Sequence, residues 1–270
     1  MTKSVSTRRA AKPPLAAEAE PADEEARASR SPAVSRALRI LRLLSDSNQP
    51  LGVNAIAREL DIFPSTCLHI LRAMEAQGFV TPHPEDKRWS IGLGLITVAR
   101  GALERQFPTR LAQIELDQLT GKFNLTSVLV QLDRNDRMVI VAAARPVRPF
   151  GAQVEIGRRF PAYISATGRC LAAYGALGRA ELREKFDKLR WEDPPKFDEW
   201  INQIDKARRE GVGEDLGQYV RGFHIYAAPV FENGQMKRAL AILGVQAQFR
   251  PEQLGPARTH LREAAARLSV

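Results

Sequence analysis

Apolar residues recur at two different spacings along the chain, and the pattern changes near residue 107. Before that point most stretches repeat every three or four residues, which is the period of one face of an α-helix. A first helix is predicted to start at Ser31, a residue type that caps helices, with Pro32 in its first turn. Its inward stripe is expected to consist of Val34, Leu38, Leu41 and Leu44.

The following stretch has the order of elements found in one type of DNA-binding domain. A short helix is predicted over 51–60, and a longer helix over 64–77 ends at Gly78, a residue type that closes helices. Two short strands then surround the polar turn PEDK. Helix, helix, turn, helix and hairpin in this order are typical of a winged helix-turn-helix.

The second part of the chain combines alternating strands with amphipathic helices. The predicted strands cover 126–132, 137–144, 151–156, 223–231 and 237–245. Asn233 and Gly234 between the last two are a strong hairpin signal. The predicted helices lie near 112–123 and over 165–177, 178–186, 197–211 and 251–268. Hairpin-linked strands with helices grouped around them predict an α+β domain with a largely antiparallel sheet flanked by helices.

Four segments are therefore expected. Residues 1–30 contain no aromatic residue and few large aliphatic ones, which predicts a disordered tail. A winged helix-turn-helix domain is expected over 31–92, a linking helix over 93–106, and the α+β domain over 107–270.

Composition narrows the function classes. The chain has 270 residues, of which 44% are hydrophobic and 26% charged, as in ordinary globular proteins. No apolar run is long enough to span a bilayer, and no secretory signal is visible, so we expect a cytoplasmic protein without a membrane partner. Lys and Arg number 40 and Asp and Glu 31, which gives a net charge of +9. A net positive charge is compatible with a polyanionic partner. Many soluble enzymes are equally basic where the whole proteome is rich in arginine.

Six residues are candidates for contact with DNA. Ser65, Thr66 and His69 lie on the polar side of the helix over 64–77, at the end that enters a major groove in this fold. Their hydroxyl and imidazole groups can donate to phosphates or base edges. Arg36 on the first helix is expected to contact the backbone, and Lys87 and Arg88 on the hairpin are expected to reach phosphate or the minor groove. Each is also compatible with an ordinary solvated surface.

Residues 31 to about 268 resemble the IclR family of bacterial transcriptional regulators. The resemblance is carried by SRALRILRLL, AIARELDIFPSTCLHILRAME, GFV and RWSIGLGL, and later by PAYISATGRCLAAY, ARREGVGEDLGQYVRGFHIYAAPVF and ALAILGV. It implies a winged helix-turn-helix, a linking helix and a small-molecule domain related to GAF and PAS folds. It also implies dimers or tetramers that bind pseudo-palindromic operators in double-stranded DNA.

The helix over 64–77 departs from the family pattern. The family often has Lys-Ser-Thr-Val-His-Arg where this chain has Pro64 to His69 in the order Pro-Ser-Thr-Cys-Leu-His. The usual arginine is thus His69, and a lysine is replaced by Pro64. The cation that reads guanine is missing, so we expect an operator sequence that differs from those of better-known members.

The segment PAYISATGRC resembles the effector-binding turn of the family. A tight turn into a helix presents free N–H groups that can bind a carboxylate, and the resemblance assigns these to Ala166 and Thr167. It further implies a pocket lined by Phe160, Asp215, Ile225, Ala241 and Leu243. Plain core packing is the alternative. Because some members carry serines where this chain has Ala241 and Leu243, we expect a bulkier effector, for instance an aromatic acid.

The predicted function is a DNA-binding transcriptional regulator whose operator binding is modulated by a small organic acid. The alternative is a thiol enzyme or redox sensor that uses Cys170, with His224 as its base and the helix-turn-helix as an oligomerisation module. Cys170 falls on the apolar side of a predicted helix, which favours a buried hydrophobe over a nucleophile. The four histidines show no ligand spacing, and no cofactor motif is present, so neither a metal site, a cofactor nor an enzymatic activity is expected.

Overall fold

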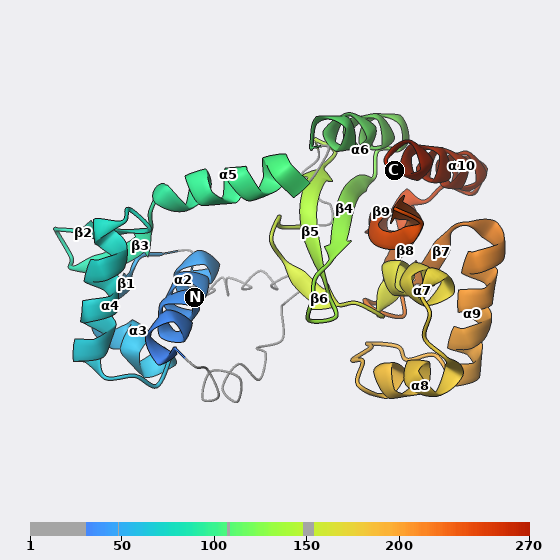
Figure 1. The fold of residues 1–270 in the computed structure, drawn as a ribbon. Coiled ribbons are helices and arrows are strands. Elements are labelled where there is room, and N and C mark those ends of the chain that lie inside the picture. Colours follow the sequence, from blue (N-terminus) through green and yellow to red (C-terminus); the bar gives the residue numbers. More distant parts are fainter. Residues whose placement is uncertain (1–30, 48, 107–108, 148–153) are drawn as a thin grey trace, which may run out of the picture. The chain divides into compact units, whose positions relative to one another are not determined.

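The computed structural model describes residues 31–47, 49–106, 109–147 and 154–270 (Figure 1). The predicted tail over 1–30 lies outside the described residues. The chain divides at residues 107 and 108 into two compact units. Each is described by itself below.

The N-terminal unit has three helices around a small sheet, followed by a further helix. Its elements are α2 (Pro32–Asp46), β1 (Leu51–Gly52), α3 (Val53–Glu59), α4 (Pro64–Ala76), β2 (Val80–His83), β3 (Arg88–Ile91) and α5 (Gly94–Gln106). The three strands are antiparallel in the order β1–β3–β2. Ile40, Ile56, Cys67 and Leu71 meet in one core, which is covered by Trp89 of the hairpin. The winged helix-turn-helix predicted from the pattern is confirmed.

Two local predictions in this unit are wrong. The side chains of Val34 and Leu38 are 57% and 51% exposed. Leu44 is buried as predicted, together with Ile40. Apolar residues occupy more than one face of this helix, and α4 and the sheet cover only one of them. Residues 51 and 52, predicted as the start of a helix, form β1 against Trp89 and Arg88.

A close backbone approach explains the glycines that follow the hairpin. A Cβ atom on Gly92 would lie 2.3 Å from the carbonyl oxygen of Gly78, and one on Gly94 would lie 2.7 Å from it. The Gly94 N–H donates to that same oxygen at 2.9 Å. The start of α5 is therefore fixed to the end of α4 by contacts that only glycine permits.

The C-terminal unit is a six-stranded antiparallel sheet with helices on both faces (Figure 1). The strand order is β6–β5–β4–β9–β8–β7. The strands are β4 (Thr126–Leu132), β5 (Arg137–Ala144), β6 (Arg159–Pro161), β7 (Gly213–Leu216), β8 (Phe223–Glu232) and β9 (Gln235–Val245). The helices are α6 (Thr109–Phe123), α7 (Ser165–Tyr174), α8 (Arg179–Asp187), α9 (Phe197–Glu210) and α10 (Pro251–Arg267), with a 3-10 turn at Gln246–Gln248. The predicted α+β class is confirmed.

Alternation along the strands separates two cores. In β4, Leu129 packs with α6 and α10 on one face, whereas Val128 and Val130 pack with α7 on the other. Successive side chains of a strand point to opposite faces of its sheet, and in β4 both faces are covered by helices. On the first face, Arg267 of α10 donates to both carboxylate oxygens of the buried Glu115 of α6, at 2.6 and 2.8 Å.

The strand predicted over 151–156 is not found at its described positions, Val154 to Ile156. The strand next to β5 is instead β6, which pairs Arg159 to Pro161 with Val139 to Arg137. The sequence pattern also missed β7, a short edge strand whose residues Gly213 to Leu216 carry no apolar alternation. No helix among the described residues is long and apolar enough to cross a membrane.

Candidate functional site

A cavity lies between α7 and the sheet of the C-terminal unit. The space between its walls is about 550 Å³, part of which is open to solvent. The lining residues come from five strands, the first turn of α7, the β7–β8 loop and the segment before β6. They are Val128, Val130, Ile140, Val154, Arg158, Phe160, Ser165, Thr167, Tyr219, Ile225, Ala241 and Leu243. The walls are mostly aliphatic, so the site suits a ligand with an apolar body.

The polar end of the cavity is the start of α7. The first hydrogen bond in this turn runs from the Gly168 N–H to the Ile164 oxygen at 3.0 Å. The N–H groups of Ser165, Ala166 and Thr167 precede that bond and have no acceptor within the helix. The Thr167 hydroxyl is buried and has no hydrogen-bond partner in the described structure. Donors that lack an acceptor and face a cavity are a place for an anionic group.

Local geometry explains why the segment SATG has this sequence. Ser165 has φ +63°, a left-handed conformation that costs a non-glycine residue about 1–2 kcal/mol. A Cβ atom on Gly168 would lie 2.1 Å from the carbonyl carbon of Tyr163. The turn therefore bends back tightly on itself, and Gly168 is required because the backbone of Tyr163 occupies the space of a side chain.

Most residues assigned to the pocket by sequence do line the cavity. Phe160, Thr167, Ile225, Ala241 and Leu243 are all part of its wall. The side chain of Ala166 is instead buried in the core beneath α7. Only its backbone N–H, at the start of the helix, is left for the predicted role.

The prediction that Asp215 lines the pocket is corrected by the structure. Asp215 is 1% exposed and is absent from the cavity wall. Its Oδ2 atom instead pairs with Nη1 of Arg169 at 3.2 Å, and its Oδ1 atom accepts the N–H groups of Gln218 and Tyr219. Burial lowers the pKa of Arg169 and the adjacent Asp215 opposes this change. An arginine remains protonated under these conditions, so the pair is an ion pair.

Seven lining residues were not predicted from the sequence. Four of them are aliphatic, and the other three are Arg158, Ser165 and Tyr219. Ser165 precedes the two residues that were predicted at the start of α7, and Tyr219 belongs to a loop without a motif. Arg158 is the charged residue among those that the structure places in the wall. It stands two positions before Phe160, and that spacing on an extended segment could have indicated a shared face.

Cys170 does not have the surroundings of a nucleophile. Its side chain is completely buried, and its Sγ donates to the Ala227 oxygen at 3.2 Å. Burial raises the pKa of this thiol to about 12. Burial also raises the pKa of Cys67 to about 11. A reactive cysteine requires a lowered pKa and access, so both thiols are packing residues.

The N-terminal unit carries the six predicted DNA-contacting residues on its surface. Arg36, Ser65, His69, Lys87 and Arg88 are exposed, and Thr66 is half-buried. Lys87 has φ +55°, which forms the tip of the β2–β3 turn, and Arg88 pairs with Asp86 at 3.4 Å.

Two further residues of this surface were not expected. Phe63, immediately before α4, is 81% exposed, although a large aromatic side chain usually becomes buried. Arg72 is exposed and follows His69 by three positions, so it lies on the same face of α4. Helical spacing from Ser65 and His69 would have identified Arg72. Nothing in the pattern marks Phe63 as exposed.

Among the residues that the structure describes, no three His, Cys, Asp or Glu side chains are grouped so that they could hold a metal ion.

Comparison with known proteins identifies both units. Residues 102–270 match the family model described as bacterial transcriptional regulator IclR C-terminal, and residues 33–84 match the IclR helix-turn-helix domain. The first match covers more than half of the chain. The chain belongs to the IclR family. It is therefore a DNA-binding transcriptional regulator, and the resemblance found in the sequence is confirmed.

Individual relatives agree with this membership. The HTH-type transcriptional regulator KdgR of Escherichia coli is 25% identical over 86% of this chain and 89% of its own length. KdgR of Dickeya chrysanthemi is 26% identical over 72% of this chain, a match that spans 64% of that relative. An IclR transcriptional regulator from Alicyclobacillus acidocaldarius has a solved structure with TM-score 0.79, 28% identity, and coverage of 89% of this chain and 98% of that one. These IclR-family relatives are regulators and not enzymes.

Proposed function

We propose that this IclR-family regulator responds to a carboxylic acid with a bulky apolar body, bound in the cavity between α7 and the sheet. The observation that carries the proposal is the unpartnered Thr167 hydroxyl at the start of α7, which lines a cavity whose walls are mostly aliphatic. A carboxylate there would accept from Thr167 and from the free N–H groups of the turn. Arg158 adds a positive charge to the same wall.

The lining of the cavity favours an aromatic acid over a two- or three-carbon acid. Ala241, Leu243 and Val128 offer no polar group to the keto oxygen of a small acid such as glyoxylate. An IclR homologue from Microbacterium hydrocarbonoxydans, 18% identical with TM-score 0.75, has been solved with 4-hydroxybenzoate. That complex supports an aromatic acid as a suitable first probe for this chain.

Calorimetric titration with benzoate, 4-hydroxybenzoate, acetate and glyoxylate tests the effector class. We expect binding of the aromatic acids and tenfold or more weaker binding of the small ones. A preference for acetate or glyoxylate would exclude the aromatic class, and binding of benzyl alcohol as tightly as benzoate would exclude the carboxylate.

We further propose that the start of α4 reads the operator. Thr66, Ser65 and His69 would contact base edges or phosphates, Arg72 a phosphate, and Phe63 a thymine methyl group in the major groove. Arg36, Lys87 and Arg88 would contact the backbone. Gel-shift titration against operator and scrambled DNA at 150 mM salt tests this, and equal affinity for both would contradict it.

We propose that the regulator acts as a dimer or tetramer in the cytoplasm, with the helix over 93–106 linking a DNA-binding domain over 31–92 to an effector domain over 107–270. Leu93 and Ile96 are 79% and 61% exposed in the single chain, and Val34 and Leu38 are exposed as well. Such apolar residues are commonly covered by a partner subunit. Light scattering should give twice or four times the mass of 30.0 kDa, and a monomer would contradict this proposal.

A further inference from the structure

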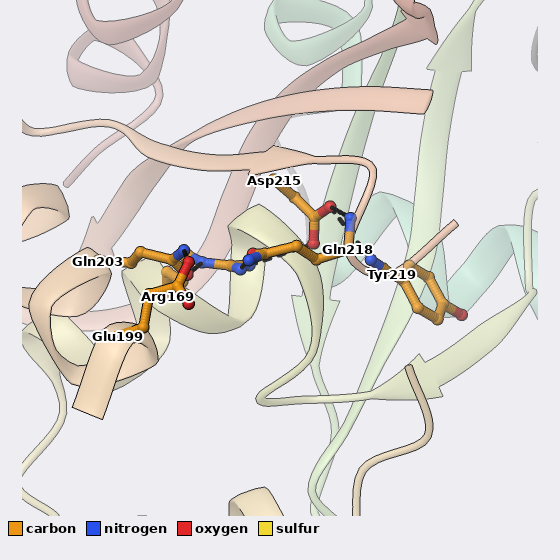
Figure 2. Close-up of polar contacts among 6 residues, drawn as sticks. All are labelled: Arg169, Glu199, Gln203, Asp215, Gln218 and Tyr219. Carbon is orange, nitrogen blue, oxygen red and sulfur yellow. Dashed lines mark hydrogen bonds and ion pairs between the residues drawn. The ribbon is translucent and has the colours of Figure 1, made fainter. Parts of the chain in front are cut away.

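Arg169 is a buried arginine whose guanidinium contacts four other side chains. Its side chain is 0% exposed. Besides Asp215, its Nε donates to Gln203 of α9 at 2.8 Å and its Nη2 donates to Gln218 of the β7–β8 loop. Its guanidinium also lies over the ring of Trp191, 5.5 Å from the centroid. Figure 2 shows Arg169 between Gln203 and Gln218, with Asp215 bonded to the loop that carries Tyr219.

The contacts of Arg169 hold the β7–β8 loop. Asp215 accepts the N–H groups of Gln218 at 2.9 Å and of Tyr219 at 3.2 Å, which closes a local turn. The Gln218 side chain accepts directly from Arg169. The segment after Trp191 fixes the outer side of the loop. There the Asp193 N–H donates to the main-chain carbonyl oxygen of Gln218 at 3.0 Å.

The same arginine belongs to the helix that starts at the cavity. Ser165 and Thr167, in the first turn of α7, form the polar end of the cavity, and Arg169 follows one half-turn later. Tyr219, which the loop presents, lines the cavity from another element. Arg169 therefore joins two parts of the wall that are about fifty residues apart in sequence.

We propose that Arg169 is a positioning residue of the effector site: through Asp215 and Gln218 it fixes Tyr219 as a wall of the cavity relative to the first turn of α7. This inference rests on the proposed effector function and assigns a role to a group that does not touch the cavity. The carboxylate of Asp215 is engaged within the protein, by Arg169 and by the N–H groups of Gln218 and Tyr219.

The two glutamine partners of Arg169 offer a matched experiment. Gln218→Ala removes the acceptor on the loop, and Gln203→Ala removes an equivalent acceptor on α9, while Asp215 still neutralises the charge in both. Both glutamines are neutral and half-buried, and Arg169 keeps its ion pair with Asp215 in either variant, so neither variant creates a buried unpaired charge. We expect Gln218→Ala to raise hydrogen exchange at the Gln218 and Tyr219 amides and to weaken benzoate binding about tenfold, the usual effect of one charge-assisted hydrogen bond. Gln203→Ala should change neither.

A conservative replacement separates positioning from a general loss of packing. Gln218→Glu keeps an acceptor for Arg169, so we expect exchange and benzoate affinity near those of the wild type. Equal exchange in Gln218→Ala and Gln203→Ala would overturn the proposal. So would a loosened loop with unchanged benzoate affinity.

The failure of the proposed function is distinguishable from that of this inference. If the wild type binds neither benzoate nor the other acids, the effector proposal fails. The exchange of the Gln218 and Tyr219 amides then still decides whether Arg169 holds the loop.

Discussion

Asp215 and Arg169 form an ion pair in the interior, with 3.2 Å between Oδ2 and Nη1, and neither side chain reaches the cavity beside them. The helix that supplies the polar end of the cavity also supplies the partner of this carboxylate. The carboxylate of Asp215 is thus paired with Arg169 and does not accept from the donors at the start of α7. The Thr167 hydroxyl and the first N–H groups of that helix therefore remain available to a ligand anion.

Breaking this pair should be costly. Asp215→Asn leaves the guanidinium of Arg169 buried without its counter-charge, and we expect a loss of about 3–5 kcal/mol in the free energy of unfolding. Arg179 and Asp198 form an exposed pair at 2.6 Å that serves as a control. Asp198→Asn should cost less than about 1 kcal/mol because solvent screens that pair. Urea denaturation measures both, and a similar small loss in the two variants would contradict a stabilising buried pair.

The Thr167 hydroxyl should matter for the ligand and not for the fold. Thr167→Val keeps the shape and removes a buried group that has no partner, so we expect unfolding stability to be unchanged or slightly higher. Benzoate affinity should fall about tenfold. Thr120 is the matched control, because its buried hydroxyl bonds to Ser127 at 2.7 Å on the opposite face of the sheet. Thr120→Val should lower stability by about 1–3 kcal/mol and leave benzoate binding unchanged. The reverse pattern would remove Thr167 from the site.

Residues on the proposed DNA-binding surface should fall into two classes, according to whether their loss weakens binding to the operator alone or to all DNA. Thr66→Ala is expected to weaken binding to the operator by about 1–3 kcal/mol and to leave scrambled DNA unaffected. Arg36→Ala is expected to weaken both equally and to lower the slope of log affinity against log salt by about one. Fluorescence anisotropy at several salt concentrations measures both quantities. If neither variant changes operator affinity, the start of α4 is not the recognition surface.

The cysteines should be inert near neutral pH. With the pKa of Cys170 raised to about 12 and that of Cys67 to about 11, both thiols stay protonated in the folded state at pH 8. We expect neither to react with a disulfide reagent until denaturant is added. Because the folded pKa values lie above the ordinary value of 9.0, the stability that the neutral thiols contribute is complete below pH 9 and is lost between pH 9 and about 12. Rapid labelling of Cys170 in the native protein would instead support the thiol alternative.

Much of the architecture followed from the sequence because the deciding patterns are local. Three features are enough to place α4: apolar residues that recur every three or four positions, Pro64 at its start and Gly78 after its end. The continuous apolar run Val128, Leu129 and Val130 is enough to predict a strand that is buried on both faces. The pattern erred in α2, where Val34 belongs to an apolar face that no other described element of the N-terminal unit covers.

The sequence by itself determined the order of elements, the winged helix-turn-helix and the antiparallel sheet. Only the tertiary structure decided that Asp215 pairs with Arg169, that Arg158 and Tyr219 line the cavity, and that Thr167 is left without a partner. Periodicity reports which face a residue occupies within its own element. Which groups meet depends on how segments dozens of residues apart converge, and a buried charge takes whichever partner that convergence brings within reach.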